Sequence, residues 1–285
     1  MRRLLLQLDT SPLPSVFDRV VAYDAGADEI MSCSGVTEEN ARDLVHGAIF
    51  TRGPKDLHNT AIFIGGADMA AGERVLRAVK EAFLGPLRVS VMLDSNGSNT
   101  TAVAAVVKLQ LAGDVRNRRT VVTAATGPVG MRVAGLLAQA GADVTVTSRR
   151  AEGGAKVAGD INRRFGTPVK AVAMADGSQA AAVLEGCELL LNAGGFGVNV
   201  IPREAWTRRP GLRAAADLNA VPPLGIEGIE AVDNGVDREG VMAFGALGIG
   251  GLKMKLHKAC IAGLFERNDL VLDAESILAV ARTLS

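Results

Sequence analysis

Short apolar segments alternate with amphipathic segments along most of the chain, and this alternation limits the fold more than any other feature. In the first third, strand-like segments cover residues 3–8, 29–33, 61–64 and 88–93, and helix-like segments cover 15–23, 37–47, 68–83 and 99–112. Strands separated by helices form right-handed βαβ units around a parallel sheet. Thr37, with Glu38 and Glu39 after it, and Asp68 are expected to start two of the helices.

A second alternating set begins after a basic, glycine-containing stretch at residues 113–119. Its strands are predicted over 120–125, 143–147, 169–173, 188–192 and 213–217, and its helices over 128–140, 151–165, 178–185 and 203–207. A glycine-rich start with a helical pattern follows over 245–265, and a last helix over 274–284. The sequence therefore predicts two α/β domains, 1–112 and a Rossmann-type domain 113–245, with helices in 246–285 that return to the first domain.

Composition excludes several classes of function. The 31 basic and 31 acidic side chains balance, so the chain lacks the positive excess of proteins that bind nucleic acids or anionic membranes. The three cysteines and three histidines show no spacing of a disulfide framework or a metal site. No segment reaches the roughly 18 consecutive apolar residues of a membrane span. A cytoplasmic enzyme without a metal ion, and without nucleic-acid or membrane partners, is expected.

The most informative local motif follows the predicted strand at 120–125 and opens the next helix. It contains the residues Thr126, Gly127, Pro128, Val129 and Gly130. Glycines at such a turn let backbone amides approach a pyrophosphate, and the helix N-terminus offers further donors to it. Pro128 suits the first position of a helix. Ala125 stands where the usual motif has its first glycine, so the motif indicates a dinucleotide-binding turn in a modified form.

The strand predicted at 143–147 supplies the second half of the nucleotide signal. It continues into Ser148, Arg149 and Arg150, with no acidic residue for a ribose 2′-hydroxyl. Hydroxyl and guanidinium groups suit a 2′-phosphate, which favours NADP over NAD. The alternative is a tight turn followed by solvated arginines. Further expected cofactor contacts follow the next strands: Asn192, Ala193, Gly194 and Asn219.

Two other segments are candidates for binding a substrate. The loop after the fourth strand is dense in short polar residues, and its candidates are Asp94, Ser95, Asn96, Gly97, Ser98, Asn99 and Thr100. These residue types suit a ligand with amide-like edges, although they also favour helix caps and turns. The second segment follows the glycine run at 245–251, where backbone can pass close to a ligand. Its candidates are Lys253, Lys255 and His257.

Missing motifs narrow the chemistry. Tyr23 is the only tyrosine and begins no Tyr-x-x-x-Lys pair, so the proton-handling mechanism of short-chain dehydrogenases is excluded. A redox step that needs no proton transfer fits better. Oxidation of an N–CH2–N bridge is such a step, because the cation left by the hydride is delocalised over both nitrogens and the enzyme only has to position the carbons and exclude water.

Several segments resemble the methylotroph NAD(P)-dependent methylene-tetrahydromethanopterin dehydrogenases. They include LLLQLDT, VSVMLDSNGSNTTA, ATGPVGMR, DLNAVPPLGIEGI and AFGALGIGGLKMKLHKACIAGLFE, and the resemblance covers nearly the whole chain. It implies reversible oxidation of 5,10-methylene-tetrahydromethanopterin to the methenyl form during formaldehyde oxidation. It also implies a pterin in an interdomain cleft beside the loop from Asp94 and the Lys253 region, and a homo-oligomer, by expectation a trimer. Asp18, Asp94 and Asn219 either contact a ligand or shape that cleft.

Three alternatives differ in function. A methylene-tetrahydrofolate dehydrogenase would use the same cofactor with another pterin, and a non-catalytic NADP(H)-sensing protein would use the cleft for regulation. A shikimate dehydrogenase shares the architecture, but the matching loops have no Lys–Asp pair. The chain also lacks the lysine that a cyclohydrolase requires. The dense polar loop argues against the sensor, and rates with each pterin separate the two dehydrogenases.

Overall fold

The computed structural model describes residues 1–195 and 197–284. The chain forms two compact units: unit 1 comprises Met1–Thr100 and Met254–Ser285, and unit 2 comprises Thr101–Lys253. Both changes of unit fall inside long helices, α4 (Ser98–Gln110) and α9 (Ala246–Gly263), which each contribute residues to both units. The divisions expected at 112/113 and 245/246 therefore differ from the observed ones, because loops mark the ends of helices and not the limits of packed units.

Unit 1 is built on a parallel five-stranded sheet. Its order is β12 (Val271–Leu272), β4 (Ser90–Leu93), β3 (Thr60–Gly65), β1 (Leu4–Asp9) and β2 (Glu29–Cys33). Four of these strands match predicted ones. The two-residue strand β12 was not predicted, because Val271–Leu272 is too short to show periodicity. It pairs with β4 through Val271 and Val91, so the C-terminal segment returns to the first sheet as expected.

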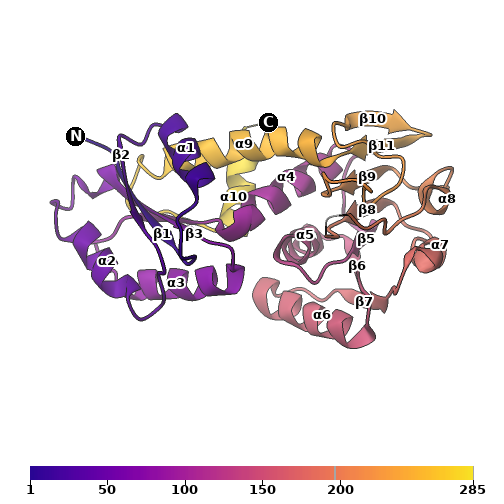
Figure 1. Cartoon of the computed structure of the whole chain (residues 1–285), viewed down its shortest axis with the longest axis horizontal. Helices are drawn as coiled ribbons and strands as arrows, with labels where there is room; N and C mark the ends of the chain where they lie inside the picture. The colour runs from indigo at the N-terminus through magenta and orange to yellow at the C-terminus, as the bar shows by residue number, and fades with distance from the viewer. Residues whose placement is uncertain (196, 285) are drawn as a thin grey trace. The chain divides into compact units, whose positions relative to one another are not determined.

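Helices cover both faces of this sheet. The helices that lie entirely in unit 1 are α1 (Val16–Asp24), α2 (Ala41–Ile49), α3 (Met69–Glu81) and α10 (Ala274–Ala281), with the short 3₁₀ helices η1 (Leu57–Asn59) and η2 (Ser95–Gly97) between strands. Helices α2 and α3 lie side by side on one face (Figure 1). The Asp68 side chain caps α3 by accepting hydrogen bonds from Ala70 N and Ala71 N, which confirms the predicted start of this helix.

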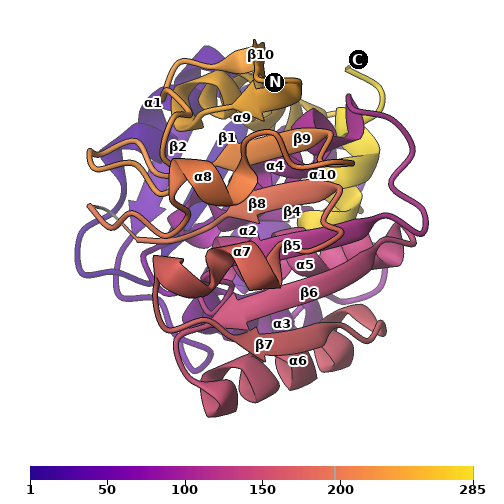
Figure 2. The same cartoon turned by 90° about the vertical axis from the view of Figure 1, so that its right-hand side faces the viewer.

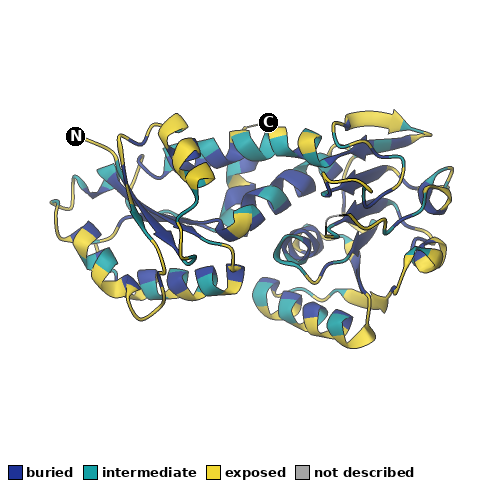
Figure 3. Ribbon diagram, viewed as in Figure 1, coloured by how far each residue is buried: buried dark blue, intermediate teal, exposed yellow. Residues whose placement is uncertain are grey.

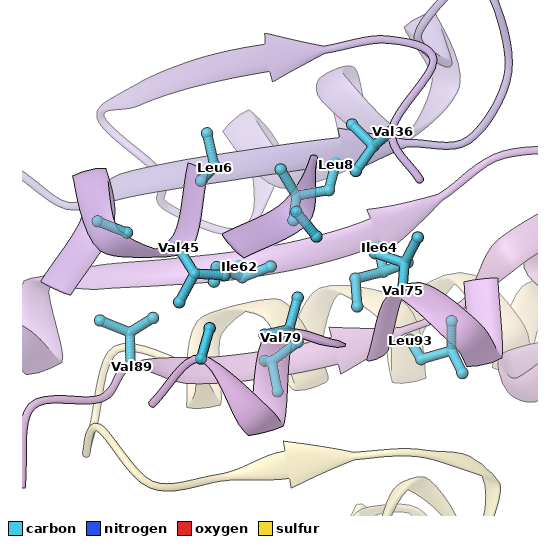
Figure 4. Close-up of a cluster of buried hydrophobic side chains, with 14 of the residues drawn as sticks. Leu6, Leu8, Val36, Val45, Ile62, Ile64, Val75, Val79, Val89 and Leu93 are labelled. Carbon is cyan, nitrogen blue, oxygen red and sulfur yellow. The ribbon is translucent and has the colours of Figure 1, made fainter. Parts of the chain in front are cut away.

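The core of unit 1 lies between the sheet and helices α2 and α3. Leu6 and Leu8 of β1 alternate with residues that face the other side, and Val45 and Val75 from the two helices pack on the same cluster (Figure 4). All four side chains are almost fully excluded from solvent. This burial on one face, repeated on the other by α1, α9 and α10, explains why the inner strands β1, β3 and β4 are largely apolar runs.

One predicted helix start is wrong. Helix α2 begins at Ala41, four residues after Thr37. The Asn40 side chain accepts a hydrogen bond from Thr37 N at 2.9 Å and donates one to Gly35 O at 3.2 Å. These local bonds hold the preceding residues in a turn, so the asparagine competes with helix formation in the way that short polar side chains do.

Unit 2 contains a seven-stranded sheet. Its order is β10 (Asn234–Arg238), β11 (Val241–Phe244), β9 (Ala214–Asp217), β8 (Leu189–Asn192), β5 (Arg119–Thr123), β6 (Asp143–Ser148) and β7 (Lys170–Ala173), most of which Figure 2 shows in succession. All neighbours are parallel except β10 and β11. The edge strands β7 and β10 are largely exposed (Figure 3). The hairpin of β10 and β11 was not predicted.

The α-helices that lie entirely in unit 2 are α5 (Pro128–Gln139), α6 (Ala151–Phe165), α7 (Ala180–Val183) and α8 (Arg203–Trp206). Helices α5 and α6 pack against each other, and a Cβ on Gly135 would lie 2.3 Å from the Phe165 ring. The opposite face of the sheet buries Trp206 in a second core. The helix expected over 178–185 is shorter than predicted, because a 3₁₀ helix, η3 (Gly177–Gln179), precedes α7.

The glycine run before the lysines is helical, not a loop. It forms the first turns of α9, and two of its glycines meet the backbone of the segment between β9 and β10. A Cβ on Gly245 would lie 2.0 Å from Glu230 O, and one on Gly248 would lie 2.0 Å from Asp233 O. A Cβ on Gly250 would meet nothing within 4 Å. Although α9 has 18 residues, no helix of the described part of the chain is long and apolar enough to cross a membrane.

Replacement of Gly248 by alanine is expected to destabilise the fold. The added methyl group would displace the backbone of the 230–233 segment, so Gly248→Ala should lower the free energy of unfolding by about 2–4 kcal/mol. Gly250→Ala is the matched control on the same helix, and it should raise this free energy by up to about 1 kcal/mol because alanine favours helix. Urea unfolding followed by circular dichroism measures both, and equal effects would contradict the proposed close contact.

Candidate functional site

A cavity of about 540 Å³ lies at the carboxyl edge of the sheet in unit 2. The chain runs from β5 outward to β6 and β7 on one side, and β8 and β9 lie on the other side, so the order of strands reverses between β5 and β8. Open parallel sheets bind ligands at such a reversal. The cavity is lined by the segments that follow β5, β6, β7 and β8, which makes it the leading candidate site.

The turn between β5 and α5 has the features of a phosphate cradle. Gly127 occupies the N-cap of α5, where no side chain of the described residues caps the helix, and a Cβ there would meet nothing within 4 Å. Pro128 is the first helical residue. A Cβ on Gly130 would lie 2.8 Å from Ala125 Cα and 2.9 Å from Ala193 Cβ. Gly130 therefore lets the helix approach the strands, while Gly127 leaves open space in front of the helix N-terminus.

The predicted cofactor residues after β6 have different positions. Ser148 and Arg149 both line the cavity. The Ser148 hydroxyl is buried and donates a hydrogen bond to Arg150 O, so it is used in holding the turn. Arg150 is the N-cap residue of α6. The exposed Arg149 is thus the residue whose guanidinium group is available to a ligand in the cavity.

A segment that the sequence analysis did not single out forms another wall. It consists of residues 174–177, which follow β7 and line the cavity. Met174 N donates a hydrogen bond to Ser148 O at 2.8 Å, so the pairing of β6 and β7 continues past the strand ends and brings Asp176 near the Arg149 segment. The strand predicted over 169–173 could have indicated this segment, because the carboxyl end of a parallel strand lies at the same edge of the sheet as the cavity.

A buried chain of polar side chains joins three strands beneath the cavity. Thr123 Oγ1 donates to Asn192 Oδ1 at 2.8 Å, and Asn192 Nδ2 donates to Asp217 Oδ1 at 2.8 Å. Asn192 Oδ1 also accepts a hydrogen bond from Gly194 N at 3.1 Å. All three side chains are almost fully buried. The network connects the ends of β5, β8 and β9 and holds the loop that begins at Ala193 against the cavity.

The side chains of Asn192 and Asn219, two residues predicted to contact the cofactor, form hydrogen bonds within the protein. The Asn192 amide lies within this network, and a Cβ on Gly225 would lie 1.8 Å from its Nδ2. Asn219 is also buried, accepts a hydrogen bond from Val221 N and donates one to Pro223 O. Ala193 and Gly194, in contrast, line the cavity directly. The sequence located these residues after the strands but not the direction of the two amide side chains.

In unit 1, the polar loop after β4 is mainly a helix cap. Asp94 Oδ1 accepts hydrogen bonds from Asn99 N and Thr100 N, and its Oδ2 accepts one from Thr100 Oγ1 at 2.6 Å. Ser95 Oγ donates to Gly65 O at 2.9 Å, and the Ser98 side chain is buried too. Only Asn96, with a left-handed φ of 54°, and the half-buried Gly97 reach the surface of this loop. The alternative of an elaborate cap therefore accounts for most of its polar residues.

The other predicted substrate residues lie on α1 and α9. His257 is buried, its ring stacks on Phe63 with centroids 5.5 Å apart, and its Nδ1 lies 3.9 Å from Asp94 Oδ2. Lys253 precedes His257 by one helical turn and shares its face of α9, whereas Lys255 is exposed and lies off that face. Asp18 is in the first turn of α1 and is half-buried.

Asp18 belongs to a group of polar residues at the carboxyl edge of the unit 1 sheet. The strand order of this sheet reverses between β1 and β3. A Cβ on Gly65, the last residue of β3, would lie 3.3 Å from Asp9 Oδ2 and 3.5 Å from Asp18 Oδ2. This reversal is the place in unit 1 where a ligand is expected by the same topological rule. Asp9 and Gly65 were not among the predicted site residues.

Two of the cysteines are not candidates for nucleophilic chemistry. Burial raises the pKa of the Cys187 thiol to about 12 and that of the Cys260 thiol to about 12. The charge on Asp94 acts in the same direction on Cys260. Both groups are therefore protonated at neutral pH and behave as small apolar side chains.

A family model and a known relative that match this chain carry the same description. A family model described as methylene-tetrahydromethanopterin dehydrogenase, N-terminal, matches residues 16–96. Over 286 residues the chain is 50% identical to the bifunctional protein MdtA of Methylorubrum extorquens, covering 100% of this chain and 99% of the relative. It is 33% identical over 264 residues to the NAD(P)-dependent methylenetetrahydromethanopterin dehydrogenase of the same organism, covering 89% of each.

Solved structures support the fold. Shikimate 5-dehydrogenase of Listeria monocytogenes has a TM-score of 0.54 at 14% identity, with 99% of this chain and 96% of that chain covered. The 5-ketofructose reductase of Gluconobacter sp. has a TM-score of 0.53 at 18% identity, with 100% and 99% covered. At these identities the likeness concerns the fold alone, and it confirms the predicted class: an α/β protein with a Rossmann-type unit.

The buried network beneath the cavity is expected to stabilise unit 2. Asn192→Leu would leave Thr123 and Asp217 without their shared partner, so it should lower the free energy of unfolding by about 2–4 kcal/mol. Thr123→Val removes one hydroxyl group and should cost about 1 kcal/mol. The control is Asn162→Leu on the exposed face of α6, which should change this free energy by less than about 0.5 kcal/mol. A similar loss in all three variants in urea unfolding would rule out a special role for the network.

Proposed function

Because the chain belongs to the methylene-tetrahydromethanopterin dehydrogenase family, we propose that it transfers hydride from 5,10-methylene-tetrahydromethanopterin to NADP. The product is the methenyl form, and NAD is a possible second acceptor. The observation that supports this most is the joint presence of a family relationship over most of the chain and a phosphate cradle at the β5/β8 reversal. The proposed setting is formaldehyde oxidation by one-carbon metabolism.

The residues around the cavity fit a dinucleotide. Gly127 leaves space for a pyrophosphate before the start of α5, and the amides of the first helical turn supply donors for it. Arg149 follows the second strand of the nucleotide-binding unit and lines the cavity, which supports its proposed contact with the 2′-phosphate of NADP. The segment 193–194 follows β8 and lines the cavity, and the hydrogen bond from Gly194 N to Asn192 Oδ1 fixes its position.

The proposed reaction requires the protein to position the two reactants and to exclude water from them. When bound, NADP supplies an acceptor carbon for the hydride. The substrate carbon lies between two nitrogens, so the positive charge left behind is shared by them and no side chain has to move a proton. The contribution of this chain is to hold both reactants in contact and to keep water from the cation.

The pterin is proposed to bind at the carboxyl edge of the unit 1 sheet, where its strand order reverses. Asp18 and Asn96 are proposed to contact the pterin, since they lie at the carboxyl edge of the unit 1 sheet and are not fully buried. The contact expected of Lys253 stays a prediction. Asp94, Asn99 and Thr100 are positioning residues, because their hydrogen bonds fix the start of α4. The homo-oligomer stays a prediction of the family resemblance, and the cytoplasmic location stays a prediction from composition.

Initial rates of nicotinamide reduction test the function. The assay compares methylene-tetrahydromethanopterin with methylene-tetrahydrofolate, each with NADP and with NAD, by the absorbance of the reduced nicotinamide. A rate with the methanopterin and NADP is expected. A rate with the folate alone would replace the proposed substrate, and no rate with either pterin would overturn the proposed reaction.

Arg149 is expected to distinguish NADP from NAD. Arg149→Ala removes the guanidinium group expected beside the 2′-phosphate, so the binding free energy of NADP should weaken by about 1.5–3 kcal/mol while NAD binding changes little. Arg163→Ala, at the far end of α6 and ion-paired with Asp160 on the surface, is the control and should affect neither cofactor. Equal losses for NADP and NAD in Arg149→Ala, measured by fluorescence titration, would refute the assignment of the 2′-phosphate.

A further inference from the structure

The cavity of unit 2 extends beyond the position proposed for the ribose. If the pyrophosphate lies at the β5–α5 turn and the ribose at the end of β6, the next strand in the same direction is β7. The base at that end of a dinucleotide must therefore meet the residues that follow β7. These are residues 174–177, all of which line the cavity. The inference below rests on the proposed use of an adenine dinucleotide.

Asp176 is the charged residue of this segment. Its Oδ1 accepts hydrogen bonds from Ser178 N at 2.9 Å and from Ser178 Oγ at 2.5 Å, as the N-cap of η3. Both hydrogen bonds use the same oxygen. Within residues 1–195 and 197–284, Oδ2 makes no hydrogen bond, and the residue is exposed at the cavity wall. One oxygen thus anchors the carboxylate, and the other is available to a ligand.

The segment that carries Asp176 is held in place on both sides. Ala175 N donates a hydrogen bond to Gln179 Oε1 at 2.6 Å. A Cβ on Gly177 would lie 3.0 Å from the ring of Pro202, so the backbone there packs closely on that proline. Met174 is buried at the start of the segment and lines the cavity. Such fixed polar groups beside an apolar surface are the usual means of orienting a base.

The carboxylate is a pure acceptor at neutral pH. The Ser178 hydroxyl, followed by the Ser178 amide, holds the pKa of Asp176 below its usual value. An ionised carboxylate accepts hydrogen bonds and cannot donate them. It therefore favours a base edge with an amino group and disfavours one with a carbonyl oxygen.

We propose that Asp176 selects the adenine base of the cofactor, with its Oδ2 accepting a hydrogen bond from the 6-amino group. Hypoxanthine presents a carbonyl oxygen in place of that amino group and would face the carboxylate with like polarity. Asp176 is then a specificity-determining residue for the base, independent of Arg149, which acts on the 2′-phosphate.

The substitution Asp176→Asn makes a distinctive test, because it reverses the polarity of one atom. The two donors of Ser178 require an acceptor, so the amide oxygen keeps the position of Oδ1. The amide nitrogen then takes the position of Oδ2 and presents a donor to the base. The asparagine variant should therefore disfavour adenine and accept hypoxanthine, whereas a residue that only caps η3 would leave the choice of base unchanged.

The experiment compares the binding of NADPH with that of reduced nicotinamide hypoxanthine dinucleotide phosphate. Nicotinamide fluorescence gives both dissociation constants for the full chain and for two variants. The wild-type chain should prefer NADPH by about tenfold, and Asp176→Asn should abolish or reverse this preference. Asp143→Asn is the control, since Asp143 pairs with Lys170 at the amino end of the neighbouring strand, away from the cavity. It should keep the wild-type preference.

Each result bears on one step of the inference. A tenfold preference that persists in Asp176→Asn would overturn the role of Asp176 and leave the cofactor assignment intact. Equal binding of both dinucleotides by the wild-type chain would do the same. Failure of the wild-type chain to bind NADPH at all would overturn the proposed function, and the inference with it. Circular dichroism shows whether the variant is folded, so a loss of base preference is distinguished from a loss of folding. The expected result is a folded variant with an abolished or reversed preference.

Discussion

Buried carboxylates at the carboxyl ends of strands hold the functional edges of both sheets in place. Asp9 at the end of β1 accepts hydrogen bonds from Ser11 N and Ser15 N. Asp94 after β4 and Asp217 at the end of β9 accept pairs of amides in the same way. A charge taken out of water is costly unless such donors surround it. Each carboxylate therefore allows only those loop conformations that bring the amides to it. In unit 2, Asp217 also holds Asn192, whose Oδ1 accepts the hydrogen bond from Gly194 N at the cavity wall.

Burial divides the polar residues at the strand ends into two groups with different roles. Those that are fully buried, such as Asn192 and Thr100, satisfy other protein groups and set the shape of the loops. Those that keep an exposed atom, such as Arg149 and Asp176, remain available to a ligand. A polar residue at a strand end is thus either a support or a contact, and its burial decides which.

Much of the fold could be predicted from the sequence because the central strands are buried on both faces. Apolar runs such as those of β5 and β8 can be predicted from the local sequence alone. Strand β10 could not be found in this way, since its residues are exposed and mostly polar. Its pairing with β11, which tertiary contacts determine, makes it a strand. Residues 174–177 were missed for a related reason, as their importance comes from pairing beyond the end of β7.

The candidate site was predictable in its location but only partly in its side chains. The glycines of the phosphate turn have a strict geometric requirement, and that requirement is visible in the sequence. The direction of an amide such as Asn192 depends on Thr123 and Asp217, which are distant in the chain. No local pattern encodes it. The loop from Asp94 illustrates the same limit, because short polar residues serve caps and ligands equally well.

The exposed edges of the unit 2 sheet have a consequence for behaviour at high concentration. An unpaired strand invites another chain to extend the sheet. Here β7 begins with Lys170, and β10 carries Asp237 and Arg238 together with an irregular register between Asn234 and Val236. An incoming strand would have to bury these charges and match a bent edge. Both borders of the sheet therefore resist polymerisation, which protects the fold from aggregation by strand addition.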